Sequence, residues 1–172
     1  MILKIISGGQ TGADRGGLEA ARACGVEHGG WCPRGRLAED GVIPADFHLT
    51  ETKSAGYPER TEKNVIEAHC TVIFTFGPPT GGSKKTRELA GKYGRPCLCV
   101  DLAVLTDEAA ARLVLEWLSP GGLMSPALAV PPPHPVLNVA GSRESKSPGL
   151  QKRVAEVMRQ VLKPPFYPTH GE

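Results

Sequence analysis

The segment Ile2-Leu-Lys-Ile-Ile-Ser-Gly-Gly-Gln-Thr-Gly-Ala-Asp-Arg15 decides the fold class of this chain. Residues 2–6 form a nearly continuous apolar run, which is typical of a strand buried on both faces of a parallel sheet. Glycines follow, and after them we expect a helix with Thr11 as its cap and Asp14 three residues further on. A buried strand that passes through glycines into a helix indicates an α/β fold.

Strand and helix signals continue to alternate along the chain. Apolar runs predict strands at residues 71–76, 96–101 and 135–140, with a short strand at 30–32. Apolar residues at helical spacing predict further helices from residue 59 or 60 to 68, from the glycine loop 77–83 to 93, from 106 onward, and over 149–162. We therefore expect a Rossmann-like, three-layer α/β/α fold with a mainly parallel, doubly wound sheet.

The length of 172 residues fits one domain, which we place at residues 1–165. Residues 26–56 show little periodicity and give no clear elements. The proline-rich stretch 119–135 is long for a loop, so we expect either a surface excursion or a segment that contacts a second subunit. Residues 166–172 are expected to form a flexible tail.

Composition excludes several classes of protein. The chain is 40% apolar and 22% charged, as globular proteins are, and its net charge of +2 gives no electrostatic case for a nucleic-acid or membrane partner. No apolar run approaches the roughly 20 residues of a membrane span, and the first apolar run is too short for a signal peptide. The five cysteines are scattered without a CxxC pair, so we expect reduced thiols, a cytoplasmic location and no bound metal.

The glycine loop after the first strand is the first candidate site. Backbone amides at a helix N-terminus attract anions, and glycines let a ligand approach the backbone closely. The loop matches neither the dinucleotide nor the P-loop fingerprint, and a tight turn without a ligand is the alternative. We expect this loop to hold a phosphate-bearing ligand through Gly8, Gly9, Gln10, Thr11, Gly12 and Arg15.

A second glycine loop, Thr80-Gly-Gly-Ser-Lys-Lys-Thr86, repeats the arrangement after a central strand. Loops at the carboxyl ends of parallel strands converge on one crevice, so the two loops are expected to face each other. The predicted ligand groups here are Gly81, Gly82, Ser83, Lys84 and Thr86, although the lysines also suit a solvated helix surface.

Three arginines, whose planar fork suits phosphate, complete the candidate set. Arg60 and Arg143 lie at a predicted helix start and a predicted strand end, where the ligand is expected, and Arg34 flanks a turn. Each of them also suits a surface ion pair. No nucleophile–base pair and no zinc-binding spacing of histidines occurs, so the sequence shows no catalytic site.

Several motifs, taken together and in order, carry a family resemblance. They are Ser7-Gly-Gly-Gln-Thr-Gly-Ala-Asp14, Gly30-Trp-Cys-Pro-Arg-Gly-Arg36 with Glu39-Asp-Gly41, Glu51-Thr52, Tyr57 with Arg60-Thr61 and Asn64-Val65, Thr80-Gly-Gly-Ser83, and Leu137-Asn-Val-Ala-Gly-Ser-Arg-Glu-Ser145. This set resembles the putative molybdenum carrier family. That family is similar to the Rossmann-like group of molybdenum cofactor carriers, LOG-type phosphoribohydrolases and DprA-like proteins.

The resemblance implies a doubly wound sheet, a homo-oligomer (dimer or tetramer) and a ligand between the two glycine loops. The implied ligand is molybdenum cofactor, which is a pterin carrying a phosphate, or a nucleotide-like molecule. The stretch 119–135 looks like an insertion relative to the family.

The related hydrolases imply an alternative function, cleavage of the N-glycosidic bond of a nucleoside 5′-monophosphate. Against their motif P-G-G-x-G-T-x-x-E, the segment Gly81–Glu88 keeps both glycines and the glutamate. Lys84 and Lys85 replace the second-half Gly and Thr, so Glu88 is the catalytic candidate only under this alternative, and the altered loop favours a carrier.

Overall fold

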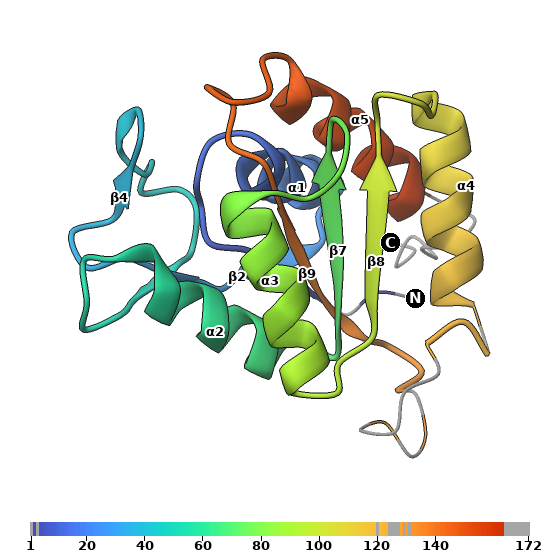
Figure 1. The fold of residues 1–172 in the computed structure, drawn as a ribbon, viewed down its shortest axis with the longest axis horizontal. Coiled ribbons are helices and arrows are strands. Elements are labelled where there is room, and N and C mark those ends of the chain that lie inside the picture. The colour runs from blue at the N-terminus through green and yellow to red at the C-terminus, as the bar shows by residue number, and fades with distance from the viewer. Residues whose placement is uncertain are drawn as a thin grey trace, which may run out of the picture.

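The computed structural model describes residues 2, 4–119, 121–123, 128, 130 and 132–163. Within these residues the centre is a sheet of five parallel strands in the order β2-β1-β9-β7-β8 (Figure 1). Their bounds are Lys4–Ile6 for β1, Glu27–Gly29 for β2, Cys70–Thr75 for β7, Cys97–Asp101 for β8 and Val136–Gly141 for β9.

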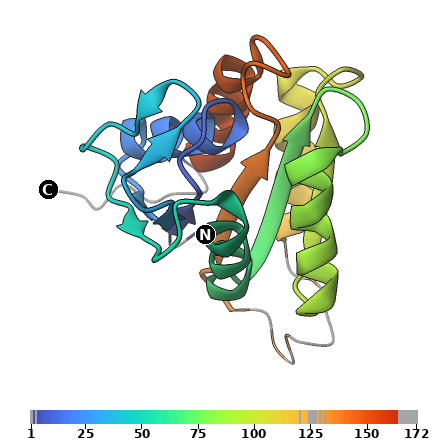
Figure 2. The same ribbon diagram turned by 60° about the vertical axis from the view of Figure 1, so that its left-hand side comes forward.

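Helices cover both faces of this sheet (Figures 1 and 2). On one face α5 packs between α1 and α4, and on the other α2 packs against α3. The helices are α1 (Ala13–Ala23), α2 (Tyr57–Glu67), α3 (Gly81–Lys92), α4 (Asp107–Leu118) and α5 (Leu150–Leu162). The expected Rossmann-like α/β/α fold with a doubly wound parallel sheet is confirmed.

The core has one cluster on each face of the sheet and a third that contains Leu18, Ile43 and Phe47. The main cluster joins the strands to α1, α4 and α5, and its fully buried members include Phe74, Leu137 and Met158. Val65 and Leu89 lie in the cluster under α2 and α3. The apolar periodicity of each helix thus faces the sheet, as a helix in this architecture requires.

The strand order creates a crevice at one edge of the sheet. Strand β9 lies between β1 and β7. Helix α1 leaves β1 on one face, and α3 leaves β7 on the other, so the two connections diverge above the carboxyl end of β9 (Figure 2). In doubly wound sheets a ligand crevice opens at such a switch point.

Residues 26–56 contain elements that the sequence did not predict. Strand β2 is only three residues long and partly polar, and it exists because β1 pairs with it along its length. The predicted strand at 30–32 is β3 (Trp31–Cys32), which pairs with β6 (Thr50–Glu51) outside the central sheet. Strands β4 (Leu37–Ala38) and β5 (Gly41–Val42) form an antiparallel hairpin.

Two predicted helix starts were wrong. The cap of α1 is Gly12, because the Thr11 hydroxyl instead donates to the Glu39 carboxylate and accepts from the Glu144 amide. Helix α2 begins at Tyr57, two to three residues early, and carries a proline in its first turn, where the missing N–H costs nothing.

All five cysteines are free thiols, as expected. Burial raises the pKa of Cys70 and of Cys97 to about 12, so both stay protonated. In the described part of the chain, no helix has the length and apolarity needed to cross a bilayer. The predicted tail 166–172 lies outside the described residues, as does much of the predicted excursion 119–135.

Candidate functional site

A crevice of about 310 Å³ lies at the switch point. Four segments line it: the β1–α1 loop, the start of α2, the start of α3, and the end of β9 with the β9–α5 loop. The lining residues are Gln10, Asp14, Tyr57, Pro58, Arg60, Thr61, Thr80, Gly82, Ser83, Thr86, Ala140, Gly141, Ser142, Arg143 and Lys146. A pocket of this size and position is where this fold binds small molecules.

A buried ion pair forms one end of the crevice. Arg60 Nη1 lies 2.9 Å from Asp14 Oδ2, and the two side chains are only 13% and 5% exposed. The guanidinium rests directly on the backbone of Gly8, where a Cβ would come within 1.7 Å of Nη1. Asp14 also accepts a hydrogen bond of 3.3 Å from the Gln10 amide. Gly8 is therefore the residue that makes room for Arg60.

Burial raises the pKa of Asp14 above its ordinary value of 3.8. The Arg60 guanidinium and the Gln10 amide act in the opposite direction but do not cancel the effect of burial. Asp14 is thus a carboxylate whose ionised form depends on Arg60.

The start of α3 forms the other end. The Ser83 side chain is buried, with the residue 3% exposed, yet its hydroxyl takes part in no hydrogen bond among the described residues. The hydroxyl oxygen itself is not fully enclosed, and since Ser83 lines the crevice, the hydroxyl is open to the crevice. The Lys146 ammonium reaches this end, 3.4 Å from where a Cβ on Gly81 would lie.

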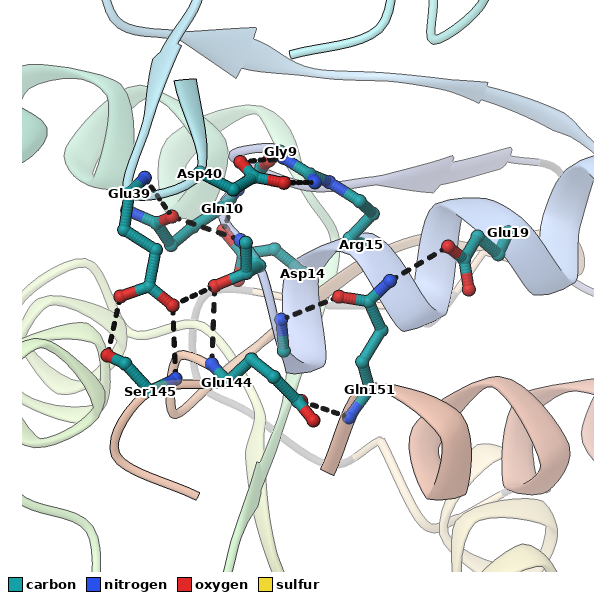
Figure 3. A network of polar contacts seen from close by, with 12 residues as sticks. Gly9, Gln10, Asp14, Arg15, Glu19, Glu39, Asp40, Glu144, Ser145 and Gln151 are labelled. Atoms are coloured by element: carbon teal, nitrogen blue, oxygen red, sulfur yellow. Dashed lines mark hydrogen bonds and ion pairs between the residues drawn. The ribbon is translucent and has the colours of Figure 1, made fainter. Parts of the chain in front are cut away.

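The backbone amides of the first glycine loop, by contrast, already donate hydrogen bonds to other groups of the protein (Figure 3). The Thr11 amide donates to Gln10 Oε1 at 3.0 Å, and the Gly12 amide donates to Gln151 Oε1 at 3.0 Å. The Ala13 amide donates to the Ser142 carbonyl at 3.1 Å. The backbone amides of Thr11, Gly12 and Ala13 are therefore already paired in this structure, with partners that include Gln151 and Ser142 far along the chain.

The structure brings part of the predicted site together. Six predicted residues line the crevice: Gln10, Arg60, Gly82, Ser83, Thr86 and Arg143. The Thr86 hydroxyl, however, donates to the Gly82 carbonyl at 2.9 Å. The predicted residues that do not line the crevice are Gly8, Gly9, Thr11, Gly12, Arg15, Arg34, Gly81, Lys84 and, for the hydrolase alternative, Glu88.

The charged residues among these have identifiable positions. Arg15 forms an ion pair with Asp40 and donates to the Gly9 carbonyl, so it is turned away from the crevice (Figure 3). Lys84 and Arg34 are exposed outside it. The Glu88 side chain is 51% exposed and lies 4.0 Å from Lys85. Helical periodicity places Lys84 and Glu88 away from the face of α3 that carries Ser83 and Thr86.

Sequence reasoning missed Asp14, Tyr57 and Lys146 as site residues. The Tyr57 ring lies 5.6 Å from Arg60 Cζ and 6.0 Å from Arg143 Cζ. Each of the three lies within three residues of a predicted site residue on the same segment, which is the signal that was available. In the described residues, no group of three or more His, Cys, Asp or Glu is placed to hold a metal ion.

Glu39, in the turn of the β4–β5 hairpin, ties two crevice loops together (Figure 3). Its carboxylate accepts from the Thr11 hydroxyl, from the Ser145 amide at 3.1 Å and from the Ser145 hydroxyl at 2.6 Å. Burial alone would raise the pKa of Glu39, but the hydrogen bonds from Ser145 and Thr11 outweigh it and lower the pKa below 4.5. We call this link from Glu39 to Thr11 and Ser145 the latch.

Replacing this latch by Glu39→Gln should destabilise the protein by about 1–2 kcal/mol at pH 7, since hydrogen bonds to a charged group are lost. Because the pKa of Glu39 is lowered, the stability that its carboxylate contributes is present above pH 4.5. This stability is lost as the pH falls through the pKa of Glu39 in the folded protein. Urea unfolding of both proteins should show a difference that shrinks on acidification. The control is Glu27→Gln, which removes an exposed ion pair with Lys4 and should cost less than 1 kcal/mol. A loss of stability in Glu39→Gln that does not depend on pH would contradict the role of this latch.

Comparison with known protein families and solved structures identifies the family of this chain. A model of the circularly permutated YpsA SLOG family matches residues 5–162. The chain belongs to this family. A crystal structure of a putative molybdenum carrier protein from Syntrophus aciditrophicus SB is similar to it, with 39% sequence identity and a TM-score of 0.84. The similarity covers 94% of this chain and 96% of the other, and no curated protein matches significantly. The family confirms the resemblance seen in the sequence motifs.

Proposed function

We propose that this SLOG protein is a carrier that binds a phosphate-bearing small molecule in the crevice. Molybdenum cofactor, as cargo, is the ligand we favour, and a nucleotide is the second choice. The name of the similar structure supports the first, and the size and position of the crevice suit either.

The observation that carries the proposal is the free Ser83 hydroxyl at the start of α3. A helix N-terminus favours negative charge, and here it lies beside the Lys146 ammonium and a buried hydroxyl that has no hydrogen-bond partner in the described part of the chain. We place the phosphate at this end because the opposite end holds the Asp14 carboxylate, which would repel it.

The charges of the crevice suit one phosphate group. Among the lining residues the cations are Arg60, Arg143 and Lys146, and Asp14 offsets Arg60. Arg143 is 40% exposed, and its guanidinium comes no nearer than 4.0 Å to the Glu39 carboxylate, so it is loosely held and available to an anion. Two cationic groups therefore remain for a phosphate dianion.

The hydrolase alternative is not favoured. It needs an acidic side chain at the position of Glu88 to stabilise a developing cation, and Glu88 lies outside the crevice beside Lys85. The carboxylate inside the crevice, Asp14, is engaged by Arg60.

Ser83→Ala tests the proposal directly. The variant removes one hydrogen bond to a charged ligand, worth about 1.5–3 kcal/mol, so affinity for a phosphate monoester such as AMP should fall by about 10- to 100-fold in calorimetric titration. Lys84→Ala, one residue away on the exposed side of α3, is the matched control and should change affinity little. Native mass spectrometry of the purified protein would identify a co-purifying ligand. Equal affinities of Ser83→Ala and the wild-type protein would refute the phosphate position.

A further inference from the structure

Two polar atoms at the α1 end of the crevice have no partner. None of the hydrogen bonds in the described part of the chain reaches Oδ1 of Asp14 or Nε2 of Gln10. Among the described residues, the fully buried side-chain atoms without a partner are Arg15 Nε, His28 Nε2 and Arg60 Nε. The Asp14 and Gln10 atoms are not fully buried, and since both residues line the crevice, these atoms keep contact with it. Both residues are otherwise buried.

The other atoms of these two side chains are fixed. Asp14 Oδ2 accepts a hydrogen bond from Arg60 at 2.9 Å and another from the backbone N–H of Gln10 at 3.3 Å. Gln10 Oε1 accepts from the amides of Thr11 at 3.0 Å and Glu39 at 2.9 Å. These bonds leave Asp14 with an acceptor, and Gln10 with a donor, toward the crevice. The side chains are held in place before any ligand arrives, as a selective site requires.

We propose that Asp14 and Gln10 recognise the uncharged end of the ligand, with Asp14 Oδ1 accepting from an N–H or O–H and Gln10 Nε2 donating to a neighbouring acceptor. This inference rests on the function proposed above and adds the chemical class: a phosphate monoester whose far end carries a donor beside an acceptor. A ring amide edge or a sugar hydroxyl has this chemistry. Tyr57, which lines the same crevice, offers an aromatic surface for a planar ring.

A site built in this way discriminates strongly. A ligand without the donor leaves a buried carboxylate oxygen unpaired, which costs more than the hydrogen bond itself is worth. The selectivity should therefore appear as a difference between matched ligands rather than as a general change in affinity.

The test titrates three phosphate monoesters and inorganic phosphate into the protein. IMP has a ring N–H beside a carbonyl, purine riboside 5′-monophosphate lacks both, and 2′-deoxy-IMP lacks one sugar hydroxyl. We expect the wild-type protein to bind IMP at least about tenfold tighter than one of the two analogues, which also identifies the source of the donor.

Asp14→Asn should abolish that preference. The Arg60 guanidinium and the backbone N–H of Gln10 both need an acceptor. The side-chain oxygen of the new asparagine therefore faces them, and its NH₂ group faces the crevice. Should this variant fold poorly, Gln10→Glu is the second one, since it keeps the oxygen bound by Thr11 and Glu39 and turns the crevice-facing donor into an acceptor. It should weaken IMP binding about tenfold.

The outcomes separate this inference from the proposed function. Ser83→Ala should weaken binding of all three monoesters by the same factor and leave their ratios unchanged. Equal binding of the three by the wild-type protein, or a preference that survives both Asp14→Asn and Gln10→Glu, would overturn the role of Asp14 and Gln10 alone. No binding of any monoester or of inorganic phosphate would overturn the proposed function, and this inference with it.

Discussion

Gly12→Ala should destabilise the protein by about 3 kcal/mol or more, one of the two largest losses we expect from a single substitution. A Cβ on Gly12 would lie 2.2 Å from the Ser142 carbonyl oxygen and 2.8 Å from the Glu144 amide nitrogen. Both are backbone atoms of the β9–α5 loop and cannot rotate away. The loop must move, which breaks the Ala13–Ser142 hydrogen bond and displaces one wall of the crevice.

Gly25→Ala is the matched control. Gly12 and Gly25 both have a positive φ, +81° and +67°, but no atom beyond the adjoining residues lies within 4 Å of a Cβ on Gly25. The control therefore measures only the cost of a left-handed alanine, about 1–2 kcal/mol. Urea unfolding should show the larger loss for Gly12→Ala. Similar losses in the two variants would mean that the loops do not pack as tightly as described.

Arg60→Met should cost about 3–5 kcal/mol at pH 7, because it leaves the Asp14 carboxylate buried without its cation. The methionine keeps much of the apolar stem that packs in the crevice wall. Lys92→Met, at an exposed pair with Glu62, is the control and should cost less than 1 kcal/mol. Chemical unfolding of both variants and of the wild-type protein provides the comparison.

The loss in Arg60→Met should depend on pH. Burial already raises the pKa of Asp14 above 3.8, and removal of Arg60 raises it further. A group with a raised pKa contributes stability that is fully present below its unfolded value and is lost as the pH rises through its folded value. The difference between Arg60→Met and the wild-type protein should therefore shrink as the pH falls from 7 toward 3.8. A constant difference would show that packing, not the buried charge, causes the loss.

Much of the crevice followed from the sequence because parallel strands end on one side of a sheet. The placement of Arg60, Arg143 and Ser83 at element ends was enough to predict that they converge, and all three line the crevice. Whether a residue on such a segment faces the crevice was not predictable. Arg15 and Arg60 are both arginines beside the first loop, yet Asp40 draws one away and Asp14 holds the other in place.

The local pattern of the chain determined the layers of the fold. Continuous apolar runs, and apolar residues that recur with a period of 3.6, need no distant information, so β7, β8, β9 and the helices were predictable within a few residues. The family motifs are likewise local. Short elements such as β2 were not predictable, because the three residues Glu27-His28-Gly29 become a strand only when β1 supplies hydrogen bonds.

Tertiary structure alone decided which of the two helix starts has its polar groups already paired. The first loop has the glycines and helix start of an anion site, but Gln151, Ser142 and Asp14 satisfy its amides. The sequence does not reveal pairing between residues as distant as Gly12 and Gln151, which are 139 positions apart, since it depends on how α1 and α5 pack side by side. The sequence predicted that two helix starts would face each other, and the structure places β9 between their strands. The folded chain filled one of them with its own acceptors and left the Ser83 hydroxyl free at the other.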